Sequence, residues 1–62
     1  MNSFYPIVIA ELKSLGFYFD RQGKGSHEIW TNGSKSFPVP VSIKSRHTAN
    51  GIMKDAGSTK KV

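Results

Sequence analysis

Two prolines alternate with valines in the segment 36–42, SFPVPVS, and this pattern limits where the segment can lie in a folded chain. On an extended backbone, Phe37, Val39 and Val41 fall on one face and the prolines on the other. Proline has no backbone N–H to donate to a neighbouring strand, so a strand that contains two of them belongs at the edge of a sheet. The segment therefore predicts an edge strand with one apolar face.

Two earlier segments with the same period of two complete a sheet. In the segment 17–22, FYFDRQ, Phe17 and Phe19 share one face, and the residues GKG then turn the chain into SHEIWTN. Asn32-Gly33 follows, and it is a strong hairpin signal because both residues tolerate positive φ. A three-stranded antiparallel meander gives the proline-containing strand the edge position that it needs.

The length of the second hairpin loop decides which residues of the middle strand face the core. A loop of two or four residues turns Glu28 and Trp30 toward the apolar face of the third strand. A three-residue loop turns His27 and Ile29 there instead, and we favour it because Ile29 is then buried in place of Glu28. Trp30 would then lie on the open face, where it could stack on a base or simply support the sheet.

Helical patterns flank the predicted strands at both ends of the chain. Ser3 can cap a helix that runs to about Leu15, before a glycine that stops it. Thr48 is the expected N-cap of a last helix that ends at Gly57, and we expect residues 58–62 to fray. Apolar residues recur at helical spacing in both segments: Val8, Ile9, Leu12 and Leu15, then Ile52, Met53 and Ala56. The order predicts an α+β fold, α-β-β-β-α, with a three-stranded antiparallel sheet and two helices on one face.

The chain is short and contains no cysteine, which bounds its domain organisation and its chemistry. Sixty-two residues make a single domain, 1–62, with an ordered core over about 3–57. The lack of cysteine excludes disulfides, cysteine-based zinc sites and thiol catalysis. Two histidines make a poor metal site, so we expect neither a metal nor a cofactor. Glu11 and Lys13 interrupt the continuation of a short apolar run, so we expect no membrane span, no signal peptide and a cytoplasmic location.

The charge of the chain is strongly positive for its size. Nine Lys and Arg residues stand against four Asp and Glu residues, which gives a formal net charge of +5. Glu28 is the only acid between Arg21 and Arg46, and the basic residues of that part of the chain are Arg21, Lys24, Lys35, Lys44 and Arg46. Such clusters make contacts to phosphates, although basic surfaces also serve solubility or bind acidic proteins. We therefore expect an anionic partner.

The segment 23–30, GKGSHEIW, places a histidine directly after a glycine-rich turn. Histidine gains and loses a proton near neutral pH, so His27 can serve as a general acid or base. Taken alone, a histidine at the start of a strand is more often an ordinary polar surface residue. The motif becomes informative through its place in the whole chain.

The whole pattern resembles the HicA toxins of bacterial toxin–antitoxin systems. The resemblance runs from about Phe4 to Gly57 and is carried by LKSLGF, GKGSHEIW, VPVS and TANGIMKDAG in that order. Its most specific part is the triplet Gly25-Ser26-His27. The resemblance implies a fold like that of double-stranded-RNA-binding domains and an mRNA interferase, an endoribonuclease that degrades messenger RNA and inhibits translation and growth. It also implies a HicB-type antitoxin that neutralises the toxin.

In that family the histidine of the triplet is catalytic, which implies the same role for His27. RNA supplies its own nucleophile, the 2′-hydroxyl, so His27 could act as a general base on it, or as a general acid on the leaving oxygen, without a metal. We expect products with a 2′,3′-cyclic phosphate and a 5′-hydroxyl. Position and residue type suggest further contacts to RNA from Lys24, Gly25, Ser26, Arg21, Lys44 and Arg46.

The chain departs from the family pattern after the third strand. Many members have a second histidine there, where this chain has Ser42, and the resemblance carries no role onto His47. Two other functions fit the same residues. The fold could bind RNA without cutting it, or it could act mainly as one half of a complex with an acidic antitoxin that covers the site. We expect the free toxin to be monomeric.

Overall fold

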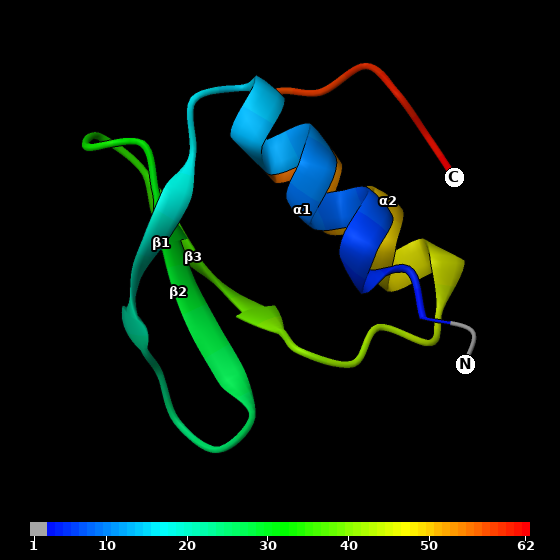
Figure 1. The fold of residues 1–62 in the computed structure, drawn as a ribbon. Coiled ribbons are helices and arrows are strands. Elements are labelled where there is room, and N and C mark those ends of the chain that lie inside the picture. The colour runs from blue at the N-terminus through cyan, green and yellow to red at the C-terminus, as the bar shows by residue number, and fades with distance from the viewer. Residues whose placement is uncertain (1–2) are drawn as a thin grey trace.

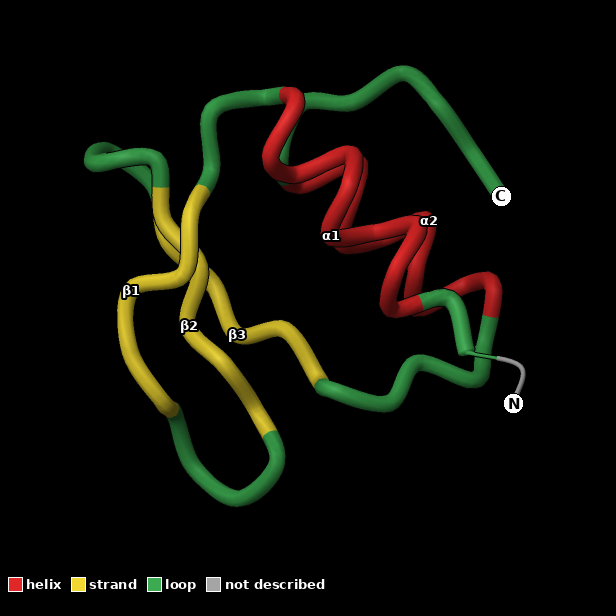
Figure 2. The backbone as a smooth tube through the Cα atoms, viewed as in Figure 1, coloured by secondary structure: helices red, strands yellow, loops and turns green. Residues whose placement is uncertain are grey.

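The computed structural model describes residues 3–62, and within them it contains two helices and three strands (Figures 1 and 2). In chain order these are α1 (Tyr5–Ser14), β1 (Tyr18–Gln22), β2 (His27–Thr31), β3 (Ser36–Pro40) and α2 (Arg46–Asp55). The strands form an antiparallel sheet in the order β1-β2-β3, and the two helices lie side by side on one face of it. The α+β prediction is confirmed, and the proline-containing strand β3 lies at the sheet edge.

Both helices end at a glycine in the left-handed region of the backbone. Gly16 has φ +90°, and the N–H of Phe17 then donates to the carbonyl of Leu12 at 2.9 Å. α2 ends in the same way at Gly57, which has φ +93°. Glycine adopts this conformation without the penalty that a side chain brings, and the reversed chain satisfies carbonyls that the last helical turn leaves free. The stop after α1 turns Phe17 into the core, where it is buried.

The helix starts differ from the predicted caps. Thr48 was expected to cap α2, but this prediction is wrong, because Ser45 has an extended backbone and its hydroxyl accepts from the Thr48 N–H at 3.4 Å. α2 therefore begins earlier than expected. At α1 the N-cap residue is Phe4, so the prediction that Ser3 is the cap is also wrong. The Ser3 hydroxyl accepts from the Tyr5 N–H and from the Ile43 N–H, each at 3.1 Å. Ser3 thus joins the start of α1 to the segment that leads into α2.

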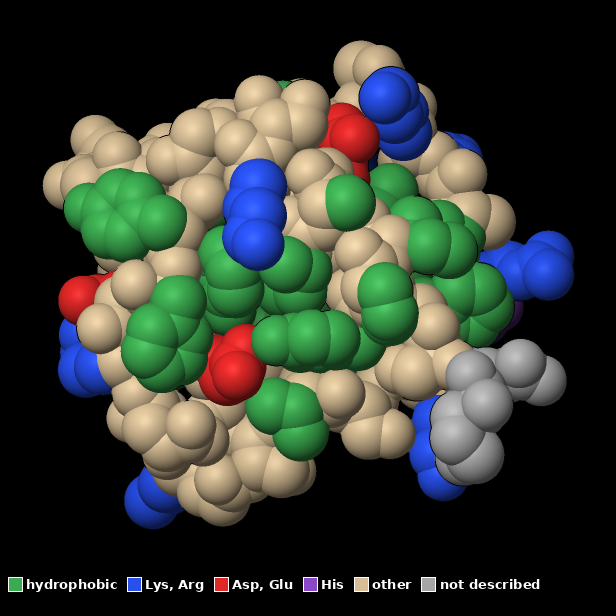
Figure 3. Space-filling model, in the orientation of Figure 1, with side chains coloured by type: hydrophobic (Ala, Val, Ile, Leu, Met, Phe, Trp, Pro, Cys, Tyr) green, Lys and Arg blue, Asp and Glu red, His purple; other side chains and the backbone are tan. Residues whose placement is uncertain are grey.

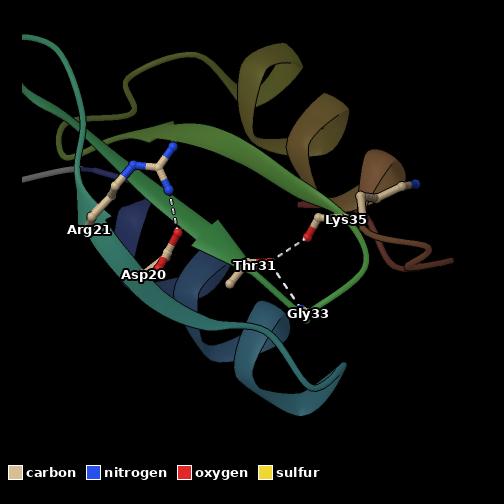
Figure 4. A network of polar contacts seen from close by, with 5 residues as sticks. All are labelled: Asp20, Arg21, Thr31, Gly33 and Lys35. Atoms are coloured by element: carbon tan, nitrogen blue, oxygen red, sulfur yellow. Dashed lines mark hydrogen bonds and ion pairs between the residues drawn. The ribbon is translucent and has the colours of Figure 1, made fainter.

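The loop between β2 and β3 holds four residues, 32–35, because Thr31 lies opposite Ser36. The expected three-residue loop is wrong. Side chains at the start of the loop stabilise the longer form: the Thr31 hydroxyl accepts from the Gly33 N–H and donates to the Lys35 carbonyl, both at 3.0 Å (Figure 4). Gly33 has φ +95°, as the hairpin signal required.

This register turns Trp30 and Glu28 toward the helices. Trp30 is only 4% exposed and packs in the core, so the expectation of an open-face tryptophan is also wrong. Glu28 is half-buried, yet its carboxylate accepts from the Tyr5 hydroxyl at 2.6 Å and from Trp30 Nε1 at 3.1 Å. The free-energy cost of burying a carboxylate is much smaller when two hydrogen-bond donors replace its water. We had favoured burial of Ile29 in order to avoid this cost, and the two donors remove that argument.

Residues 58–62, which we expected to fray, form neither helix nor strand and run back beside the helices (Figure 1). The Ser58 hydroxyl donates to the Glu11 carboxylate at 2.8 Å, and the Val62 N–H donates to the side-chain oxygen of Asn50 at 2.7 Å. Lys60 forms an ion pair with Glu11 at 3.5 Å. These contacts join the tail to both helices. Neither of the two described helices is long and apolar enough to cross a membrane.

Candidate active site

The turn between β1 and β2 presents His27 as the first residue of β2. The Gly23 N–H donates to the His27 carbonyl at 2.8 Å, and the His27 N–H donates to the Lys24 carbonyl at 3.1 Å. Gly25 has φ +58°, a conformation that glycine adopts readily. The glycine-rich segment therefore forms a turn that is closed by two backbone hydrogen bonds, one to the carbonyl of His27 and one from its N–H.

Two contacts from outside the turn, one from β1 and one from the residue after β3, hold the same backbone. The Gln22 side chain donates from Nε2 to the His27 carbonyl at 2.8 Å, and the Val41 N–H donates to the Ser26 carbonyl at 3.0 Å. On β3, the Cα partner of His27 is Pro40. His27 is thus anchored through its main chain to β1 and to the end of β3, and its side chain is left exposed.

Gly23 is the glycine of this turn that close packing requires. A Cβ added there would lie 3.1 Å from Ile29 Cδ1 and 3.2 Å from the His27 carbonyl oxygen. A Cβ at Gly25 would meet nothing within 4 Å, so that position needs glycine for its backbone angle alone. Any side chain at Gly23 would displace either Ile29 or the backbone of His27.

The His27 ring lies on the face of the sheet opposite the helices, because Trp30 and Glu28 occupy the other face and side chains alternate. Its Nδ1 is 3.2 Å from the Lys24 carbonyl oxygen. In the tautomer protonated at Nδ1, this nitrogen donates to the carbonyl and Nε2 keeps a free lone pair. The ring is then oriented so that Nε2 can take a proton from a bound molecule.

The structure brings some of the sequence-predicted RNA contacts near His27. Lys24, Gly25 and Ser26 form the exposed turn itself. Arg21 lies opposite Ile29 because the pairing of β1 with β2 shifts between Phe19 and Arg21. This shift puts Arg21 on the same face as His27, where its guanidinium pairs with Asp20 (Figure 4).

Lys44 and Arg46 lie in another part of the fold. Lys44 is in the loop after β3 and Arg46 is the first residue of α2, and this loop leads away from the β1–β2 turn (Figure 1). Among residues 3–62, neither forms a hydrogen bond or ion pair with the turn. On the face shown in Figure 3, basic side chains are spread over the molecule rather than gathered in one patch.

A second polar group, absent from our sequence predictions, lies behind the turn on the helix side of the sheet. It consists of Tyr5, Glu28 and Trp30, with both donors bound to the same carboxylate oxygen of Glu28. Burial raises the pKa of Tyr5 to about 12, with further contributions from the hydrogen bond to Glu28 and from its negative charge. The alternation of residues along the strand indicates that Glu28 and Trp30 lie on the same face. The sequence gives no local sign of the contact to Tyr5, because Tyr5 lies far away along the chain. The group fixes the face on which Glu28 lies, and thereby the face on which His27 lies.

Comparison with known proteins gives one match. A family model described as the HicA toxin of bacterial toxin–antitoxin systems matches residues 7–58, which include most of α1, the whole sheet, the His27 turn and all of α2. No curated protein and no solved structure matches the chain. Because the family match covers nearly the whole chain and includes the candidate site, this protein belongs to the HicA family of toxins.

Proposed function

We propose that this chain is an endoribonuclease toxin that cleaves messenger RNA with His27 as its acid–base residue, and that a HicB-type antitoxin neutralises it. Family membership supports the toxin role. The observation that carries the catalytic part is the exposed His27 ring, whose Nδ1 lies 3.2 Å from the Lys24 carbonyl oxygen and whose Nε2 has no hydrogen-bond partner among residues 3–62. An oriented imidazole on an exposed turn that also carries a lysine suits a phosphodiester substrate.

The proposed reaction uses the nucleophile that RNA contains. Neutral His27 accepts the proton of a 2′-hydroxyl at Nε2, the 2′-oxygen bonds to the adjacent phosphorus, and the bond from phosphorus to the 5′-oxygen breaks. The leaving 5′-oxygen takes a proton from water or from the His27 imidazolium formed in the first transfer. The products are a 2′,3′-cyclic phosphate and a 5′-hydroxyl. Such proton transfer is worth about 10²–10⁴-fold in rate. Lys24 offsets the charge that develops on the phosphate oxygens, and no step requires a metal.

The test compares induced expression of the wild type with that of His27→Ala, scoring growth and RNA integrity together. We expect the wild type to arrest growth with loss of messenger RNA, and His27→Ala to leave both intact. Lys13→Ala, an exposed change on α1, serves as the control and should remain toxic. Equal growth arrest by His27→Ala would overturn the assignment of His27.

A second experiment tests the chemistry with purified protein. An oligoribonucleotide should be cut in excess chelator to products with a cyclic phosphate, and a strand deoxy-substituted at the scissile nucleotide should stay intact. Cleavage of the deoxy-substituted strand would exclude the 2′-hydroxyl mechanism. Binding without any product in the wild type would instead identify a non-catalytic RNA-binding module.

A further inference from the structure

A basic hollow lies between α2 and the tail formed by residues 58–62. It has a volume of about 400 Å³, and the lining residues that bear on its chemistry are His47, Asn50, Gly51, Lys54, Lys60 and Lys61. None of the described residues that line it is acidic or a large apolar side chain. Figure 1 shows the tail beside the helices, on the side away from the sheet, so this hollow is separate from the His27 turn.

The wall that the tail provides is held in place by specific contacts. The Val62 N–H donates to the Asn50 side chain at 2.7 Å, and the Ser58 hydroxyl donates to Glu11 at 2.8 Å. Glu11 also pairs with Lys60 at 3.5 Å and so offsets part of its charge. Among residues 3–62, Lys54 and Lys61 form no ion pair. Two ammonium groups at the hollow are therefore available to an anion.

Gly51 is a glycine that neither conformation nor packing explains. It lies inside α2, where glycine is unfavourable relative to alanine, and it does not have the positive φ that would favour glycine. A Cβ added there would meet nothing within 4 Å. The residue is exposed and lines the hollow, so the missing side chain leaves the α2 backbone open to close approach by a bound molecule.

We infer that this hollow binds the phosphate backbone of an RNA strand, as a contact site additional to the His27 turn; the choice of RNA rests on the proposed function. Lysine ammonium groups beside amide and hydroxyl donors are the groups that contact nucleic-acid phosphates. A protein partner would instead be expected to bury large apolar anchors, and none of the described lining residues is a large apolar side chain. The contact is mainly one of charge, because three of the lining residues are lysines, and none of the described lining residues is Phe, Tyr or Trp, on which a base could stack most strongly.

The test measures binding of a fluorescein-labelled 2′-O-methyl oligoribonucleotide, which has no free 2′-hydroxyl and cannot be cut by the proposed reaction. Fluorescence anisotropy at several salt concentrations gives the affinity and its salt slope. For Lys54→Gln/Lys61→Gln we expect affinity to fall on the order of tenfold and the slope to fall by about 1.4, because each phosphate contact on a single strand contributes about 0.7. Gly51→Glu, which places a carboxylate in the hollow, should also weaken binding.

The control is Lys13→Gln, which removes one charge from an exposed lysine outside the hollow and is compared with Lys54→Gln and Lys61→Gln made singly. Its salt slope should stay at the wild-type value. An equal loss in control and hollow variants would overturn the inference, since net charge alone would then explain binding. Unchanged RNA affinity with weakened binding of purified antitoxin would also overturn it, and would assign the hollow to a protein.

The outcome is separable from that of the proposed function. If the wild type fails to cut RNA while Lys54→Gln/Lys61→Gln still loses affinity and slope, the proposed cleavage fails and the binding site stands. If the wild type cuts RNA and the hollow variants bind the probe as the wild type does, the inference fails and the proposed cleavage stands.

Discussion

His27 is positioned by backbone groups of its own turn and by one side chain of β1. Its carbonyl accepts from Gly23 and from the Gln22 side chain, its N–H donates to the Lys24 carbonyl, and its ring Nδ1 lies beside that same carbonyl. The partner of the ring is a backbone carbonyl, which carries no ionisable group. It can orient the ring through a hydrogen bond, but it does not gain or lose a proton as a carboxylate partner would. The residue thus needs the fold of the turn more than it needs any one neighbouring side chain.

Glu28, the next residue in the chain, has the opposite surroundings. It points toward the helices, and its carboxylate receives the hydroxyl of Tyr5 and the indole of Trp30. Neighbouring residues of a strand face opposite sides of the sheet, so the register that turns Glu28 toward the helices also turns His27 toward the open face. Loss of the Glu28 contacts should weaken the register of β2.

Tyr5→Phe tests this contact. Removal of a hydrogen bond to a charged group should lower the free energy of unfolding by about 1–2 kcal/mol at neutral pH, as measured by urea denaturation. The pKa of Tyr5 is raised from 10.0 to about 12, so the folded chain holds this proton more tightly than the unfolded chain. The resulting stabilisation is complete below pH 10 and is lost as the pH rises toward 12.

The wild type should therefore lose stability between pH 10 and 12 more steeply than Tyr5→Phe, in which this group cannot titrate. All other groups are the same in the two proteins, so the difference between the two curves isolates Tyr5. Parallel curves would show that the folded chain does not hold the Tyr5 proton more tightly than the unfolded chain does, contrary to the pKa raised by burial and by Glu28.

The elements show which features of the fold are readable from local sequence. The prolines of β3 predicted an edge strand, and Gly16 predicted the end of α1, because each limits its own backbone. The loop after β2 was mispredicted by one residue because the decisive contact joins Glu28 to Tyr5, far away in the sequence. Local patterns set the order of the elements, and long-range polar contacts set the register.

The candidate site divides in the same way. The Gly25-Ser26-His27 triplet identified the turn, and the structure places it at an exposed position with an oriented ring. The facing of His27 depended on the register and could not be read locally. Arg21 reaches the same face only through the irregularity in β1, which no residue of FYFDRQ signals by itself.

At the start of α2 the two candidate caps can be separated by substitution. Ser45→Ala should lower the free energy of unfolding by about 1 kcal/mol, because it removes the oxygen that accepts from the Thr48 N–H. Thr48→Ala changes an exposed residue in the first turn, where alanine is the better helix former, so stability should hold or rise slightly. Thermal unfolding of both variants checks the order, and a larger loss for Thr48→Ala would contradict the assignment of Ser45.

Because the molecule is small, its few long-range hydrogen bonds and ion pairs are important for its stability. A chain of 62 residues buries only about 60% of the surface that it exposes when unfolded, so its stability depends on small increments. The described core contains nine residues from both helices, the sheet and the connecting segments: Val8, Ile9, Leu12, Phe17, Trp30, Val39, Ile43, Ala49 and Met53. Outside this core, the tail is joined to the rest by Glu11 and Asn50.

Glu11→Gln should therefore affect the molecule well beyond α1. Glu11 accepts from Ser58 and pairs with Lys60, and its side chain is only 13% exposed, so loss of its charge weakens both tail contacts at once. We expect a cost of about 1 kcal/mol, which lowers the melting temperature of a domain of this size by about 4–8 °C. The Val62 amide, which donates to Asn50 at the far end of the tail, should exchange its hydrogen faster. Unchanged exchange at Val62 together with a lowered melting temperature would show that Glu11 stabilises α1 alone, and that Asn50 holds the end of the tail without help from Glu11.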